Sequence, residues 1–88
     1  MIYNNFGNSG LKISAISLGT ANSFDPAELQ NYQSIIELAY KKGINYFDTA
    51  EIYGIGVSET LLGTCLKNLN IPRSEIIIGT KVLTAVNP

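Results

Sequence analysis

The fold is decided by Gly43-Ile-Asn-Tyr-Phe-Asp48-Thr-Ala-Glu-Ile-Tyr53-Gly54, where a short apolar run ends in an acid and a tyrosine follows five residues later. A second apolar run, Ile76-Ile-Ile-Gly-Thr-Lys81, leads to a lysine. Both runs have the length and composition of buried strands. The sequence therefore predicts two strands that each present a charged side chain at or just beyond the carboxyl end.

A hairpin and a further strand are predicted before this stretch. Met1–Phe6 and Leu11–Ser14 are apolar-rich runs on either side of four turn-forming residues, a pattern typical of a β-hairpin. Ala15–Leu18 then predicts a short strand that leads into Gly19 and Thr20.

Two helices are predicted between the strands. Asp25 can cap the first, with Pro26 at its first position, and Ser58 can cap the second, which Pro72 ends. Apolar residues recur at helical spacing in both. The first face contains Leu29, Tyr32, Ile36, Ala39 and Tyr40, and the second contains Leu61, Leu62, Cys65, Leu66 and Leu69.

Strands that alternate with helices indicate an α/β fold with a parallel sheet. An open doubly wound sheet lacks support, because Gly54-Ile-Gly56 would need a glycine where Glu59 stands. In a barrel, chemistry gathers at the carboxyl ends of the strands, where Thr20, Asp48, Tyr53 and Lys81 all fall. We therefore expect residues 1–88 to form one partial domain: a hairpin, three strands and two helices of an incomplete (β/α)8 TIM barrel.

The composition excludes several function classes. The 88 residues have a net charge of −1, which gives no electrostatic argument for nucleic acid. No apolar run approaches the ~20 residues of a membrane span, so we expect no membrane insertion. The chain has no histidine and one cysteine, so we expect no metal site. Cys65 falls on the apolar face of a predicted helix, so we expect it to be a buried structural thiol. A single cysteine also fits a reducing, cytoplasmic location.

Asp48, Tyr53 and Lys81 are the candidate catalytic residues. A phenol has an ordinary pKa near ~10, and a neighbouring ammonium makes it a better acid. Tyr53 would then be the general acid, Lys81 would tune it and Asp48 would orient Lys81. Protein side chains supply no hydride, so a nicotinamide cofactor is implied.

Each of these residues also has a purely structural interpretation. Asp48 could cap the turn after its strand, Tyr53 could be a core or surface tyrosine, and Lys81 could be solvated. Their common place at strand ends favours the catalytic interpretation. We expect Glu51, between the acid and the tyrosine, to be a structural group or one that contacts the catalytic residues without reacting itself.

The motif Phe47-Asp48-Thr-Ala-Glu-Ile-Tyr53-Gly54, with Gly56, Ser58-Glu59 and Leu62-Gly63 after it, resembles the signature of the aldo-keto reductase superfamily. The beginning of the chain is similar to the start of the same proteins. The matching residues are Tyr3, Gly7-Asn-Ser-Gly-Leu11 and Leu18-Gly19-Thr20. The pattern is closest to the branch that contains the β subunits of voltage-gated potassium channels.

The resemblance implies a (β/α)8 barrel closed at the bottom by the hairpin, which uses NADPH to reduce aldehydes and ketones. It places Asp48, Tyr53 and Lys81 in the catalytic tetrad and Thr20, Ala21 and Asp48 at the nicotinamide side of the cofactor. The fourth tetrad member, usually a histidine, is expected beyond Pro88.

We therefore expect the N-terminal portion of an NADPH-dependent aldo-keto reductase acting on a small carbonyl substrate, inactive as an isolated fragment. The alternative is a regulatory subunit that binds the cytoplasmic domain of an ion channel. Ala21 stands where the channel subunits usually carry an aromatic residue, which weakens that alternative.

Overall fold

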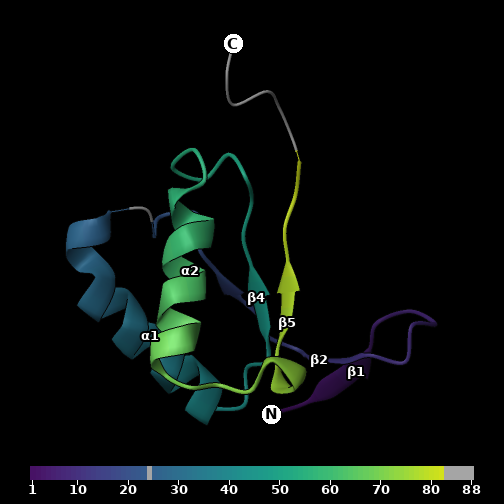
Figure 1. Cartoon of the computed structure of the whole chain (residues 1–88). Coiled ribbons are helices and arrows are strands. Elements are labelled where there is room, and N and C mark those ends of the chain that lie inside the picture. Colours follow the sequence, from purple (N-terminus) through teal and green to yellow (C-terminus); the bar gives the residue numbers. More distant parts are fainter. Residues whose placement is uncertain (24, 83–88) are drawn as a thin grey trace.

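The computed structural model describes residues 1–23 and 25–82. The predicted domain 1–88 also includes Phe24 and residues 83–88, which lie outside the described residues. The elements in chain order are β1 (Tyr3–Asn5), β2 (Lys12–Ser14), β3 (Leu18–Gly19), the 3₁₀ helix η1 (Pro26–Glu28), α1 (Leu29–Lys41), β4 (Tyr46–Asp48), α2 (Val57–Asn68), the 3₁₀ helix η2 (Arg73–Glu75) and β5 (Ile77–Gly79) (Figure 1).

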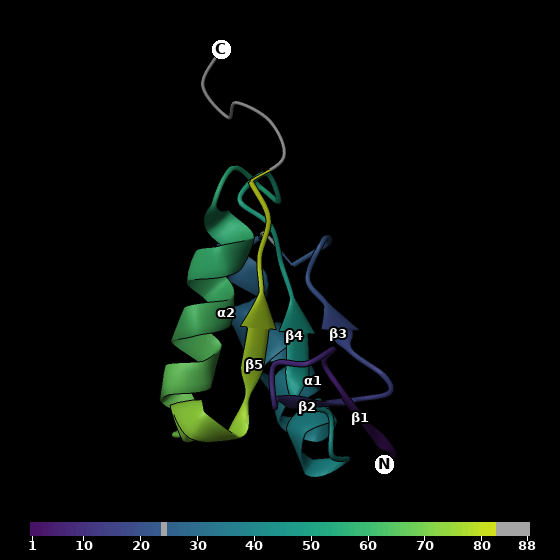
Figure 2. The same cartoon turned by 90° about the vertical axis from the view of Figure 1, so that its right-hand side faces the viewer.

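The strands form two separate sheets. β1 pairs antiparallel with β2, which confirms the predicted hairpin. The second sheet has the order β3-β4-β5 with both pairs parallel, and Asp48 lies opposite Gly19 on one side and Gly79 on the other. In Figure 2 the three parallel strands stand side by side with the hairpin below them. Within the described residues, β3 and β5 are each paired along one edge only.

The first parallel strand is shorter than the sequence predicts. The prediction of a strand over Ala15–Leu18 is wrong for residues 15–17, since β3 covers only Leu18–Gly19. The amide of Ala15 donates to the carbonyl of Ile2 at 2.7 Å, and the hydroxyl of Ser14 donates to the carbonyl of Ile16 at 2.6 Å. These bonds hold the chain to the hairpin, so it joins the parallel sheet only at Leu18.

The first helix starts largely as predicted. Asp25 Oδ1 accepts a hydrogen bond from the amide of Ala27 at 3.0 Å, and Pro26 follows it as the first residue of η1. That first turn is a 3₁₀ helix, and the α-helical part begins at Leu29. Gly43, at φ +96°, reverses the chain after α1 in a conformation that favours glycine.

The predicted cap of the second helix is wrong. α2 begins at Val57 with Gly56 as its N-cap, so Ser58 lies inside the first turn and does not cap it. Gly54, Ile55 and Gly56 have φ values of +60°, +54° and +87°. These three residues have a left-handed backbone conformation, which reverses the loop before α2. The helix therefore starts one residue before Ser58.

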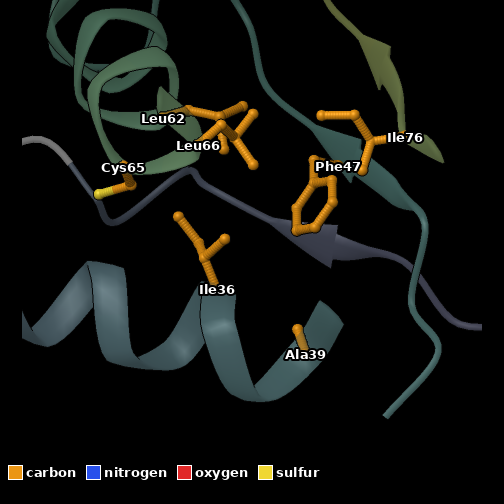
Figure 3. Packing of buried hydrophobic residues seen from close by; sticks show 7 residues of the cluster. All are labelled: Ile36, Ala39, Phe47, Leu62, Cys65, Leu66 and Ile76. Carbon is orange, nitrogen blue, oxygen red and sulfur yellow. The ribbon is translucent and has the colours of Figure 1, made fainter. Parts of the chain in front are cut away.

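The core lies between the parallel sheet and the two helices (Figure 3). Both predicted apolar faces contribute to it, with Phe47 of β4 fully buried between them. Its buried members are Ile36, Ala39, Phe47, Leu62, Cys65, Leu66 and Ile76. The burial of Cys65 confirms the expected structural thiol and raises the pKa of that thiol. The run Ile76–Ile78 is less enclosed than predicted, because β5 is only partly buried.

Asn45 attaches the hairpin to the parallel sheet at the amino ends of its strands. Its Oδ1 accepts from the amide of Ser14 at 2.7 Å, and its Nδ2 donates to the carbonyl of Lys12 at 2.9 Å. The hydroxyl of Tyr3 adds a bond to the carbonyl of Gly43 at 2.7 Å. The hairpin is thereby held beneath the strands, at the end opposite their carboxyl edge.

Across residues 1–23 and 25–82, no helix combines the length and the apolarity that a membrane crossing requires.

Candidate active site

The parallel register brings the predicted site residues to one edge of the sheet. Thr20 follows β3, Asp48 ends β4, and Lys81 lies two residues beyond β5. The amide and the hydroxyl of Thr20 both donate to the carbonyl of Asp48, at 3.0 and 3.1 Å. On the other side, the amide of Glu51 donates to the carbonyl of Lys81 at 3.1 Å. This bond involves the backbone of Glu51, so the expected role of its carboxylate stays a prediction.

Lys81 and Asp48 form an ion pair at this edge. Lys81 Nζ lies 2.7 Å from Asp48 Oδ1 and also donates to the carbonyl of Thr49 at 2.8 Å. The hydrogen bond to Asp48 raises the pKa of Lys81, with a further contribution from Tyr53 and against a smaller effect of desolvation. The two side chains are 35% and 42% exposed, so water screens the attraction in part. The pair therefore holds a charged ammonium at a fixed, accessible position.

Tyr53 lies over this ammonium. Lys81 Nζ is 5.3 Å from the centroid of the tyrosine ring, within the range of a cation–π contact. Two backbone hydrogen bonds hold the loop at Tyr53. The amide of Tyr53 donates to the carbonyl of Ala50, and the carbonyl of Tyr53 accepts from the amide of Ser58. Acid, ammonium and phenol are thus gathered from two strand ends and one loop, as the sequence predicts.

Two of the predicted cofactor-side residues, Thr20 and Ala21, lie in a tight turn. The amide of Ser23 donates to the carbonyl of Thr20 at 3.0 Å, which closes a four-residue turn with Ala21 and Asn22 exposed at its tip. Thr20 itself is buried, with its hydroxyl directed at the carbonyl of Asp48. Of the predicted cofactor residues, Ala21 and Asp48 therefore offer accessible side chains, and Thr20 holds the turn against β4.

Two further residues contact these strand ends. Ser58 Oγ lies 2.8 Å from the carbonyl oxygen of Ser23 and 3.1 Å from that of Thr20, so its one hydroxyl proton is shared between them. Glu59 accepts from the hydroxyl of Thr80 at 2.6 Å. The sequence predicts a helix cap at Ser58 and a first-turn position for Glu59, and both residues belong to the family signature. No local pattern could have identified their partners, which are 35, 38 and 21 residues away in the chain.

A cavity of about 180 Å³ lies between β3 and the two helices. Leu18, Tyr32, Ile36 and Leu61 line it, and Asp48, Tyr53 and Lys81 do not. The cavity is therefore separate from the cluster of Asp48, Tyr53 and Lys81. Among the described residues, no group of three or more cysteine, aspartate or glutamate side chains could hold a metal ion.

The sequence of the chain matches a known family. The model of the aldo/keto reductase family matches residues 15–88. The chain belongs to this family. A potassium channel β subunit of Arabidopsis thaliana, named as probable, is 37% identical over 83 residues, which are 93% of this chain and 25% of that protein. L-galactose dehydrogenase from the same plant is 41% identical over 78 residues, 85% of this chain and 24% of that enzyme. The chain thus spans about a quarter of the length of these relatives.

Solved aldo-keto reductases share the fold. The thermostable enzyme Tm1743, in complex with the inhibitor epalrestat, superimposes with a TM-score of 0.82 at 32% identity, over 93% of this chain and 31% of that one. The Klebsiella pneumoniae enzyme, in complex with NADPH, gives a TM-score of 0.71 at 28% identity, over 81% and 24%. The predicted fold class, part of an aldo-keto reductase barrel with its hairpin, three strands and two helices, is confirmed.

Proposed function

We propose that the complete polypeptide containing these residues is an NADPH-dependent aldo-keto reductase that reduces small aldehydes or ketones to alcohols. The observation that supports this most directly is the cluster at the carboxyl edge, where the Lys81 ammonium contacts both the Asp48 carboxylate and the Tyr53 ring. Residues 1–88 correspond to about a quarter of the length of the relatives, so the activity belongs to the complete protein.

The three side chains have distinct roles in this proposal. Asp48 holds Lys81 through the 2.7 Å ion pair. In this proposal the Lys81 ammonium, 5.3 Å from the centroid of the Tyr53 ring, stabilises the negative charge that Tyr53 gains as it gives up its proton. Tyr53 then donates its proton to the carbonyl oxygen of the substrate as that oxygen gains negative charge.

The residues at the edge fit the nicotinamide end of the cofactor. Ala21 is small and exposed one residue beyond Thr20, which leaves room for a flat ring, and Asp48 and Asn22 offer hydrogen-bonding partners. NADPH, when bound, supplies the hydride. The complex of the Klebsiella pneumoniae relative with NADPH supports this cofactor. A cytoplasmic location is part of the same proposal.

Replacing Tyr53 with phenylalanine in the complete protein tests the assignment. We expect kcat to fall by roughly 10²- to 10⁴-fold, the usual contribution of general acid catalysis, while the Kd for NADPH changes little. Tyr40→Phe is the matched control. It also removes one phenol hydroxyl, but from a tyrosine on α1 that donates to Glu75 and not from the site. Near-normal turnover by Tyr53→Phe would remove Tyr53 from the reaction.

A second candidate is a regulatory subunit of an ion channel. It is favoured by the 37% identity to the Arabidopsis protein named as a probable channel β subunit. The two functions share a fold and a site and differ in the surface that meets the partner. Repeated turnover of small aldehydes by the complete protein supports the reductase, whereas stable co-purification with a channel and no turnover supports the subunit.

A further inference from the structure

Ser58 is a buried hydroxyl without the capping role that its position in the sequence suggests. Its side chain is 0% exposed, and Gly56 caps the helix in its place. Its hydroxyl lies 2.8 Å from the carbonyl oxygen of Ser23 and 3.1 Å from that of Thr20. These two carbonyls belong to the first and last residues of the turn 20–23, so one buried group contacts both ends of that turn.

The turn is held on its other side by β4. The amide and hydroxyl of Thr20 both bond to the carbonyl of Asp48. With Ser58 on one side and Asp48 on the other, the base of the turn is fixed and only Ala21 and Asn22 are exposed. The orientation of this exposed tip therefore depends in part on the hydroxyl of Ser58, alongside the hydroxyl of Tyr32, which donates to the carbonyl of Asn22 at 3.4 Å.

Glu59 makes the corresponding contact to the segment that follows β5. Its Oε2 accepts a hydrogen bond at 2.6 Å from the hydroxyl of Thr80, the residue directly before Lys81. Because consecutive helical side chains point about 100° apart, one turn of α2 can reach two different strand ends. Ser58 reaches the end of β3, and Glu59 reaches the segment that follows β5.

We propose that Ser58 and Glu59 are positioning residues, through which the first turn of α2 holds the two halves of the active site. Ser58 positions the cofactor-side turn at Thr20 and Ala21. Glu59 positions Thr80 and hence the catalytic Lys81. The proposal rests on the proposed reductase function, and it predicts separate kinetic effects for two adjacent residues.

The test uses Ser58→Ala and Glu59→Ala in the complete protein. We expect Ser58→Ala to raise the Kd and KM for NADPH roughly tenfold, equivalent to about 1.4 kcal/mol, with kcat at saturating NADPH retained. We expect Glu59→Ala to lower kcat by a similar factor with the Kd for NADPH retained. Glu59→Gln should restore kcat, because its amide oxygen still accepts from Thr80.

Two variants control for a general loss of stability. Thr64→Ala removes a hydroxyl from the same helix that donates to the carbonyl of Thr60, and Glu37→Ala removes an exposed carboxylate from α1. Both should behave as wild type. If Ser58→Ala does not fold, Ser58→Cys replaces it, since a thiol has a similar shape and is a weak donor.

Hydrogen exchange separates this proposal from the proposed function. Ser58→Ala should speed exchange at the amides of Thr20 and Ser23, whether or not the protein reduces a carbonyl. If the complete protein neither binds NADPH nor turns over carbonyls, the reductase function fails, and exchange alone decides the role of Ser58. Wild-type exchange and affinity in Ser58→Ala, or equal effects of both alanine variants on kcat and Kd, would overturn the proposal.

Discussion

Lys81 shows how one side chain can serve the site and the stability of the fold. Its ammonium bonds to Asp48 and to the carbonyl of Thr49, and its pKa is raised chiefly by Asp48. The folded chain therefore binds this proton more tightly than the unfolded chain. The resulting stabilisation is complete below the ordinary lysine pKa of about 10.4 and is lost as the pH rises through the raised value.

We expect Lys81→Met to lower the Tm of the complete protein at neutral pH, and the difference from wild type to shrink as the pH rises above the ordinary lysine pKa of about 10.4. Thermal unfolding at several pH values measures this. Lys41→Met is the control, because the Lys41 ammonium lies 3.9 Å from Glu37 on an exposed helix surface and contributes little. A difference that stays constant across this range would contradict the role given to the ion pair.

Ile55 carries backbone strain at the residue scale. It has a φ of +54°, which is unfavourable for a β-branched side chain, and its side chain is 69% exposed. Ile55→Asn should therefore stabilise the complete protein by about 0.5 to 1 kcal/mol, because asparagine tolerates this conformation. Urea unfolding provides the measurement. Ile35→Asn, at an exposed position of α1, should give no such gain.

At the scale of elements, polar contacts join the hairpin to the sheet, beside an edge-to-face contact of Phe6 with Tyr46. The side chain of Asn45 bonds to the backbone of β2 at two points. The backbone amide of Asn45 also donates to the hydroxyl of Ser14 at 3.1 Å. Gly43 allows the hairpin to approach, since a Cβ there would lie 2.9 Å from Met1 Cβ and from the Tyr3 hydroxyl. The lower end of the sheet is thus covered by a hairpin whose position depends on a few named groups.

Asn45→Ala should destabilise the complete protein by about 1 to 3 kcal/mol, because it leaves the buried amide of Ser14 without its partner. Hydrogen exchange should also become faster at the amides of Phe6 and Ala15 in and beside the hairpin. Asn31→Ala, on the exposed surface of α1, is the matched control. Unchanged stability and exchange would show that other contacts hold the hairpin.

At the scale of the molecule, the described sheet has two open edges. β3 and β5 are each paired on one side, and Ile35 and Leu38 on α1 are more than half exposed. A closed TIM barrel pairs eight strands in roughly 250 residues. Unpaired apolar edges favour association with other chains.

We therefore expect the 88-residue polypeptide alone to be inactive and to self-associate or remain partly ordered. Size-exclusion chromatography, near-ultraviolet circular dichroism and NADPH titration check this. A monomer with a cooperative unfolding transition and micromolar affinity for NADPH would show that residues 1–88 fold independently.

The elements that the sequence by itself determined are those coded by local patterns. Turn residues between apolar runs produced the hairpin, and helical spacing identified both buried faces, including Cys65. Asp48, Tyr53 and Lys81 were found because parallel strands bring their carboxyl ends to one edge. Their chemical roles stay predictions.

The tertiary structure alone decided where each strand joins the sheet and what the side chains of Ser58 and Glu59 contact. Residues 15–17 have strand-like composition, but bonds to the hairpin keep them out of the ladder. A Cβ at Gly79 would overlap the hydroxyl of Tyr46 on the neighbouring strand, so the Tyr46 side chain would have to move. The physical reason is common to all of these features: each depends on partners distant in the chain, whose position is set only when the sheet and helices pack.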